Sequence, residues 1–211
     1  GVGVGGYVDI DGLAWDENSG TLYGSDTNSR LLVTINPSTW AVTPVGNIGH
    51  SAVTGLAFDS DNNILYGIDR SSQLLLNIDT TTGYGTSLGN FLDMSSGSIS
   101  NANGLAYDSA ADRLYLSNLT TIYTFDPASS LTAIDAQTIG SSTTVYGLAF
   151  DPLNNKLYGT DATDTSNNKL YEIDPTDGTG TEVGSGGIGF GFVRGLALNP
   201  DASTPALYGP T

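Results

Sequence analysis

The chain has 211 residues, of which 22 are acidic and 6 are basic, giving a formal net charge of −16, and it contains no cysteine. A charge this negative repels nucleic acids and anionic membrane surfaces, so both are excluded as partners. The lack of cysteine excludes disulfides, thiolate metal sites and cysteine nucleophiles. No apolar run approaches the roughly 20 residues that a membrane-spanning helix needs, so we expect no membrane insertion.

Two short phrases recur along the whole chain. The first, Gly-Leu-Ala followed by an apolar residue and Asp or Asn, begins at Gly12, Gly55, Gly104, Gly147 and Gly195. The second contains Leu-Tyr and lies at residues 22–24, 65–67, 114–116, 157–159 and 207–209. The first phrase returns after 43, 49, 43 and 48 residues. A period in the forties that is built from short strands is typical of a β-propeller.

Each repeat predicts four short strands. In the first repeat they are centred on residues 13–15, 21–24 and 31–35 and on a segment that ends at residue 46, with turns rich in Gly, Pro, Asn and Asp between them. No amphipathic helical run interrupts the pattern. We therefore predict one all-β domain, a β-propeller built from four complete four-stranded blades plus a partial fifth blade. The blades span about 12–54, 55–103, 104–146 and 147–194, with the partial blade formed by 195–211 together with 1–11.

The recurring residues have structural roles in this prediction. Glycine at the start of an inner strand permits neighbouring strands to approach closely near the axis, while Leu and the aromatic residue pack between sheets. The repeated tyrosines are also expected to pack within or between blades; they are Tyr23, Tyr66, Tyr115, Tyr158 and Tyr208. Nineteen of the acidic residues are Asp, which favours turns in which the carboxylate bonds its own backbone.

Taken together, Gly-Leu-Ala-aromatic-Asp, Leu-Tyr-Gly-x-Asp and Leu-x-x-Ile-Asp-Pro followed by Val-Gly resemble bacterial extracellular β-propeller repeats of the broad class that includes NHL and YVTN propellers. The resemblance covers essentially the whole chain. It implies a secreted bacterial protein at the cell surface or outside the cell, as does the acidic, cysteine-free composition. It implies little about activity, because such blades host enzymes, lectins and adhesion scaffolds.

The fifth repeat lacks a third strand in this sequence. The outermost strand of the partial blade could come from the N-terminal residues, which predicts an assembly edge made of Val2, Val4, Val8, Leu207 and Tyr208. Three interpretations stay open: a ring with one three-stranded blade, a fragment of a longer chain, and an open array completed by another subunit. The last would give head-to-tail contacts and filaments.

Five positions directly before the inner strands are expected to cluster at the mouth of the central channel; they are Asp11, Thr54, Asn103, Tyr146 and Arg194. Asp and Asn oxygens are calcium ligands, and the resemblance to propeller lactonases of the gluconolactonase type implies a calcium site here. The candidate ligands are Asp9, Asp11, Asn101 and Asn103. Tyr146 and Arg194 interrupt the ring of ligands, so a solvated channel lining is the alternative.

Other candidate sites have simpler alternatives. Residues 59–63 resemble half of a calcium loop but lack its Gly and Glu, which favours a hairpin turn. The longer acidic segment 161–168 is a second candidate ion site or a solvated loop. His50 is the only histidine, and no nucleophile elbow accompanies it, which argues against a Ser/His/Asp triad. Asn118 lies in the one N-glycosylation sequon, although it also takes the place of a repeated Asp.

We therefore expect a non-enzymatic extracellular or cell-surface propeller with a structural or recognition role, which self-assembles through its incomplete blade. Its partners would be copies of itself, other surface proteins or glycans. A calcium-dependent lactonase-like hydrolase with its site at the channel mouth is one alternative. A lectin-like binder with a shallow site between each pair of blades is another, although the segments between repeats differ more than equivalent sites would allow.

Overall fold

The computed structural model describes residues 9–95, 97–128, 130–139, 144–161, 168–188, 193–200 and 206–208. Every regular element in these segments is a β-strand, from β1 to β18. No helix in this part of the chain is long and apolar enough to cross a membrane.

Four antiparallel sheets have four strands each, in sequence order. The first consists of β1 (Ile10–Asp16), β2 (Thr21–Asp26), β3 (Leu31–Ile35) and β4 (Val42–Asn47). The second consists of β5 (Val53–Asp59), β6 (Ile64–Asp69), β7 (Leu74–Ile78) and β8 (Gly85–Asn90). The third consists of β9 (Leu105–Asp108), β10 (Arg113–Asn118), β11 (Thr121–Asp126) and β12 (Ser130–Thr138). The fourth consists of β13 (Val145–Asp151), β14 (Lys156–Asp161), β15 (Lys169–Ile173) and β16 (Gly180–Glu182). A fifth sheet pairs β17 (Ala197–Asn199) with β18 (Ala206–Tyr208).

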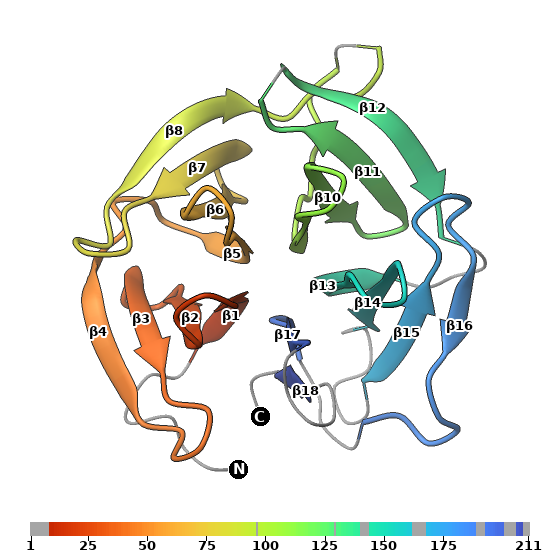
Figure 1. The fold of residues 1–211 in the computed structure, drawn as a ribbon. Helices are drawn as coiled ribbons and strands as arrows, with labels where there is room; N and C mark the ends of the chain where they lie inside the picture. The colour runs from red at the N-terminus through yellow and green to blue at the C-terminus, as the bar shows by residue number, and fades with distance from the viewer. Residues whose placement is uncertain are drawn as a thin grey trace.

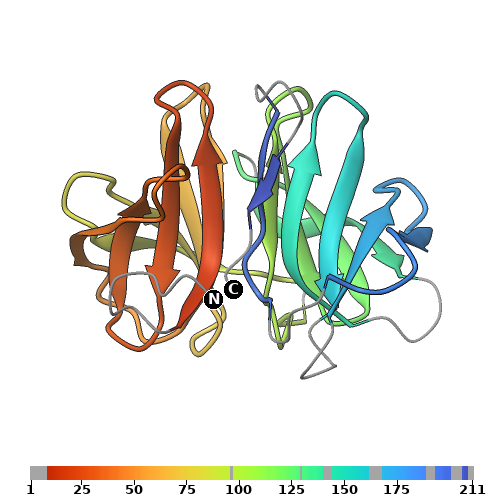
Figure 2. The same ribbon diagram turned by 90° about the horizontal axis from the view of Figure 1, so that it is seen from below.

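The sheets are the blades of a propeller. In Figure 1 they radiate from a central axis, with β1, β5, β9, β13 and β17 innermost. Figure 2 shows the strands running lengthwise between the two ends of the ring. Strand β17 contacts both β13 and β1, so the inner strands form a closed circle. The predicted all-β propeller with four four-stranded blades is confirmed, and the two-stranded fifth sheet is consistent with a partial fifth blade.

Five glycines set the distance between neighbouring inner strands. A Cβ atom at Gly104 would lie 2.2 Å from the backbone oxygen of Tyr146 in the next blade. At Gly195 the corresponding atom would lie 2.8 Å from the backbone oxygen of Asp11, where the fifth sheet meets the first blade. The equivalent contacts are made by Gly12, Gly55 and Gly147. The repeated glycine is therefore required by backbone contact around the whole ring, as the sequence predicts.

Buried hydroxyl groups tie three of these glycines, Gly12, Gly104 and Gly147, to the second strand of their blades. The Ser117 hydroxyl accepts a hydrogen bond from Gly104 N at 2.9 Å and donates one to the Tyr146 backbone oxygen at 3.2 Å. Ser25 does the same between Gly12 and Val53. These hydroxyls join consecutive blades, and the repeated phrases give no signal of them, since Ile68 holds the equivalent place in the second blade.

Aromatic rings fill the spaces between blades. Tyr23 of the first blade stacks on Phe58 of the second with ring centroids 5.5 Å apart, and Tyr115 stacks on Phe150 at the same distance. A third pair, Tyr66 and Tyr107, has centroids 6.0 Å apart. Half-buried Tyr158 packs beside Leu198 of the fifth sheet. The packing role predicted for these tyrosines is confirmed, and the side chain of Tyr208 lies outside the described residues.

Buried aspartates hold the turns that follow the inner strands. The carboxylate of Asp59 is 1% exposed and accepts hydrogen bonds from the backbone N–H groups of Asp61 and Asn62 at 3.1 and 3.0 Å. Its second oxygen accepts from the Asn62 amide. The equivalent acids are Asp16, Asp108 and Asp151. Residues 59–63 therefore form a hairpin turn stabilised by its own aspartate, and much of the acidity of the chain serves turns.

Two features differ from the simplest repeat. Strands β1, β5 and β13 begin before the glycine, so residues 10 and 11 belong to the first blade, where Ile10 adds a buried side chain to the core. The segment 90–103 between the second and third blades is part of the core, since Phe91 is fully buried and its ring centroid lies 4.9 Å from that of Phe125. The sequence presents this segment only as an insertion.

The predicted assembly edge is not tested by the fold. Val2, Val4 and Val8 lie outside the described residues, as do the side chains of Leu207 and Tyr208. The backbone of the latter two belongs to β18, which pairs with β17. Self-association through this edge stays a prediction.

Candidate functional site

The five residues predicted at the channel mouth do come together. They line one small pocket at the end of the ring where the inner strands begin, and this pocket is partly open to solvent. Arg70, from the turn between β6 and β7, completes the lining. The full set is Asp11, Thr54, Arg70, Asn103, Tyr146 and Arg194. We call this pocket the mouth pocket.

Asp11 and Arg194 face each other across the point where the ring closes. Arg194 Nη1 lies 3.5 Å from Asp11 Oδ1, and the Asp11 side chain is 8% exposed. The Thr27 hydroxyl lies 3.2 Å from Asp11 Oδ2 and 3.0 Å from Asp9 Oδ2. Burial, followed by the Asp9 charge, raises the pKa of Asp11, while Arg194 and Thr27 oppose the rise only in part. The buried carboxylate is thus held in place by a cation that also lines the pocket.

Arg70 is the functional candidate that the sequence does not single out. It follows Asp69 in a turn where the first blade has Thr27 and the third has Leu119, so no repeated pattern marks it. In the described part of the chain, Arg113, Lys156, Lys169 and Arg194 form ion pairs with carboxylates, and none is found for Arg70. The one sequence signal for it is its place beside the repeated aspartate at the same end of the ring.

Of the four predicted calcium ligands, Asp11 and Asn103 line the mouth pocket and Asp9 and Asn101 do not. Asn103 donates its side-chain amide to the backbone oxygen of Asn101 at 2.6 Å, and Asn101 does not line the mouth pocket. Asp9 is exposed and also lies outside the lining. Among the described residues, no group of three or more His, Cys, Asp or Glu side chains is placed to hold a metal ion. With two guanidinium groups beside a single carboxylate, the residues of the pocket do not fit a divalent cation.

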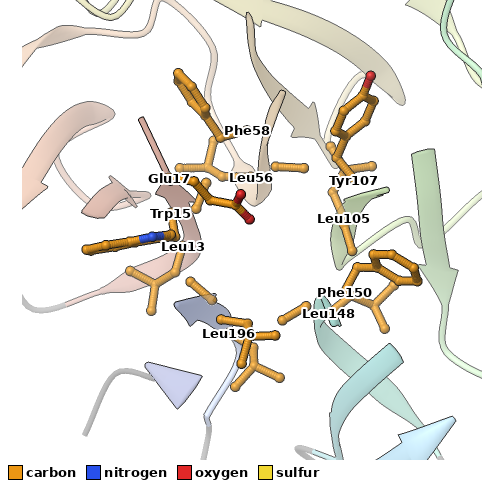
Figure 3. A pocket seen from close by; sticks show the side chains of 16 residues that line it. Leu13, Trp15, Glu17, Leu56, Phe58, Leu105, Tyr107, Leu148, Phe150 and Leu196 are labelled. Atoms are coloured by element: carbon orange, nitrogen blue, oxygen red, sulfur yellow. The ribbon is translucent and has the colours of Figure 1, made fainter. Parts of the chain in front are cut away.

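The other end of the channel is lined mainly by residues with apolar side chains. There a second pocket is lined by the Leu-Ala pair of each repeat with the aromatic residue or leucine that follows it, and by Glu17. Figure 3 shows that the rings of Trp15, Phe58 and Phe150 point away from the channel, whereas the Glu17 carboxylate lies over its opening. The polar groups that could orient a ligand are therefore gathered at the mouth pocket.

His50 is bound to an acid but not to a nucleophile. Its Nδ1 lies 3.1 Å from Asp69 Oδ2. The neighbouring Ser51 hydroxyl pairs instead with the Ser71 hydroxyl at 2.7 Å. This arrangement lacks the serine–histidine hydrogen bond of a catalytic triad.

We expect the Asp69 cluster to make stability sensitive to acid. Burial is the largest single influence and raises the pKa of Asp69, but hydrogen bonds from Ser71, Ser72 and His50 together outweigh it and hold the pKa at about 2. Because this pKa lies below the ordinary value of 3.8, the carboxylate stabilises the fold above pH 4 and loses that effect as the pH falls towards 2. The Asp69→Asn variant should be less stable by about 2 kcal/mol at pH 7. Urea unfolding across the pH range should show this difference shrinking between pH 4 and pH 2, and a constant difference would contradict the assignment.

The other predicted sites remain untested. Asn118 ends β10 and is half-buried, which leaves glycosylation of its sequon a prediction. Residues 162–167 of the second candidate ion site lie outside the described residues. Asn168, at the end of that segment, is fully buried, and its side-chain oxygen accepts a hydrogen bond from Val193 N.

Comparison with known families shows that the repeats match a family model. A family model described as a repeat of unknown function (DUF6923) matches residues 49–192. The chain belongs to this family. The DUF6923 match supports the repeat architecture, but it does not assign the chain to the NHL or YVTN class, which stays a prediction. No curated protein matches the sequence.

Solved structures similar to this DUF6923 protein share its fold at low sequence identity. Glutaminyl cyclase from Myxococcus xanthus has a TM-score of 0.67 and 18% identity over 96% of this chain and 86% of that one. A gluconolactonase from Xanthomonas campestris has a TM-score of 0.60 and 14% identity over 96% and 84%. Hydrazine synthase from Kuenenia stuttgartiensis has a TM-score of 0.57 and 15% identity over 97% of this chain, which spans only 58% of that chain. At these identities the likeness establishes the β-propeller fold alone.

Proposed function

We propose that this protein is a non-enzymatic recognition module that binds the carboxylate group of a small organic anion in the mouth pocket. One observation carries the proposal: six polar side chains that differ from blade to blade converge on one pocket, and two of them are among the six basic residues of the chain. The acidic, cysteine-free composition supports a place outside the cell for this module.

The contrast with the rest of the repeat supports a ligand site. The glycine of each inner strand is the same in all five repeats, and the residue before it is Asp, Thr, Asn, Tyr or Arg. If this position served packing alone, we would expect the same residue in every blade, as is found for the glycine. Five different polar groups around one axis instead provide hydrogen-bond donors and acceptors in a fixed asymmetric order, which is what recognition of one small molecule requires.

Charge determines the kind of ligand. The mouth pocket has two guanidinium groups and one carboxylate, so its local charge is positive although the whole chain is strongly negative. At physiological ionic strength charges beyond roughly 8 Å are largely screened, so the two arginines act against Asp11 and the adjacent Asp9 rather than against the charge of the whole chain. Guanidinium groups match planar carboxylates in geometry as well as in charge. The limited space suits the anionic end of a ligand, with the hydroxyl, amide and phenol groups around it.

Titration with lactate tests this function, with lactamide as a neutral ligand of nearly the same shape. We expect saturable binding of lactate, detected by calorimetry at low salt, and much weaker binding of lactamide. The Arg70→Gln variant should weaken lactate binding about tenfold, since a charge-assisted hydrogen bond contributes about 1.5–3 kcal/mol.

The matched control for this titration is Arg30→Gln, which changes an exposed arginine outside the mouth pocket and should leave the affinity unchanged. Equal binding of lactate and lactamide, or equal loss in both arginine variants, would refute recognition of a carboxylate at this pocket.

A further inference from the structure

A second concave surface lies on the second blade, away from the mouth pocket. It is a groove of about 520 Å³ that is open to solvent, and its lining includes Asn63, Asn77, Asp79, Tyr84, Thr86 and Leu88. Asn63 belongs to the turn between β5 and β6, and Asp79 to the turn between β7 and β8. Both turns lie where β5 and β7 end, whereas the mouth pocket lies where the inner strands begin. None of the residues that line this groove lines the mouth pocket.

Tyr84 is the unusual residue of this groove. Its side chain is 61% exposed, in contrast to the buried tyrosines that stack between blades. Its ring rests on the backbone of Gly49, where an added Cβ would lie 3.0 Å from Tyr84 Cε2. One part of the ring is thus supported by a neighbouring connection of the chain while the rest is open to solvent, so the ring forms a fixed platform.

The repeat does not require an aromatic residue at this place. In the β7–β8 turn, Asp79 N donates a hydrogen bond to the Tyr84 backbone oxygen at 2.9 Å. The same bond joins Asn36 N to Ala41 in the first blade and Asp174 N to Thr179 in the fourth. The equivalent residues are therefore small or polar, and the turn closes equally well without a ring. Tyr84 is a feature of one blade rather than of the fold.

Polar groups suited to hydroxyl-rich ligands surround the platform. Asp79 Oδ1 accepts hydrogen bonds from Thr81 N, the Thr81 hydroxyl and Thr82 N at 2.7, 2.6 and 3.0 Å, which fixes the carboxylate. These hydrogen bonds lower the pKa of Asp79, which keeps it ionised. Exposed Asn77 on β7 lies opposite Thr86 on β8. Carboxylate, amide and hydroxyl groups thus lie on the same groove as the exposed ring.

We propose that this groove is a carbohydrate-binding site, in which the C–H face of a pyranose ring packs on Tyr84 while Asp79 and Asn77 bind its hydroxyl groups. Sugars combine an apolar face with a rim of hydroxyls, and an aromatic ring beside planar polar side chains complements both. The ligand is a neutral glycan, because Asp79 repels anionic sugars. A protein partner would need a larger apolar surface than Tyr84 and Leu88 provide.

The Tyr84 platform is tested on a microarray of neutral and acidic glycans with the intact chain and three variants. We expect binding to at least one class of neutral glycan, and an affinity loss of about tenfold in Tyr84→Ala, in line with the roughly 0.5–1.5 kcal/mol of a specific aromatic contact plus its lost area. Tyr84→Phe keeps the ring and should retain most of the affinity. Leu153→Ala, which removes a 70% exposed side chain on another blade, is the matched control.

Two results would overturn the carbohydrate site: no binding to any glycan at millimolar concentrations, or glycan binding that Tyr84→Ala leaves intact. Since Tyr84 is exposed and its turn closes without a ring in other blades, a misfolded variant is not expected, and circular dichroism checks this. The mouth pocket is independent of the groove, so Arg70→Gln should leave glycan binding unchanged.

Discussion

The Gly104→Ala variant is expected to lose about 3 kcal/mol of unfolding free energy or to fail to fold. The added Cβ would lie 2.2 Å from the Tyr146 oxygen and 2.9 Å from Leu148 N, both backbone atoms of the next inner strand. Neither atom can move without separating β9 from β13. Urea unfolding followed by tyrosine fluorescence measures the loss.

Gly186→Ala is the matched control for this substitution. An added methyl group at Gly186 would meet no heavy atom within 4 Å, and the residue has no positive φ angle, so the same change should alter stability by less than about 0.5 kcal/mol. If Gly104→Ala were as stable as Gly186→Ala, the inner strands would not be in backbone contact and the packing of the ring around its axis would be wrong.

The Asp11→Asn variant is expected to bind lactate about tenfold more tightly than the unmodified protein, a gain of about 1.4 kcal/mol. Asp11 is the carboxylate that pairs with Arg194 in the mouth pocket, so neutralising it removes the anion that competes with a ligand carboxylate for this guanidinium group. The side chain changes little in shape, and the Thr27 hydroxyl can still bond an amide oxygen. Calorimetric titration at constant salt measures the gain.

Asp61→Asn provides the control for charge alone. Asp61 is exposed, lies in the turn between β5 and β6 and is outside the pocket, so removing its charge should change lactate affinity by less than about twofold after screening. If the pocket instead held calcium, the Asp11→Asn variant would lose calcium binding and would not gain affinity for lactate. An Asp11→Asn variant that binds lactate more weakly would argue that the carboxylate itself contacts the ligand.

Much of the fold could be predicted from the sequence because each repeated residue meets the same packing requirement in every blade. Gly104 and its equivalents occur where inner strands meet, and Tyr23 and Tyr115 occur where blades stack, so the same demand recurs at a fixed period. Features that break the period could not be predicted in this way. Phe91 lies in an insertion that reads as a loop, and the Ser117 hydroxyl has no counterpart in the second blade, where Ile68 replaces it.

The same distinction applies to the candidate site: the repeat predicts some of its residues and not others. The residue before each inner-strand glycine can be placed at the mouth from topology alone, which is enough to bring Asp11 and Arg194 together. Arg70 could not be placed, because a turn residue reaches the pocket only through the length and direction of its side chain. The oxygen ligands by themselves predict calcium, whereas the guanidinium groups beside Asp11 favour an anion.

Nuclear magnetic resonance of the arginine side chains during lactate titration tests the central claim most directly. The claim predicts saturable shifts of the Nε–H signals of Arg70 and Arg194 and of the Asn103 side-chain amide, with the exposed Arg30 signal unchanged and lactamide without effect. Shifts spread evenly over all arginines, or shifts at Asn103 produced by calcium rather than by lactate, would contradict a carboxylate-binding mouth pocket.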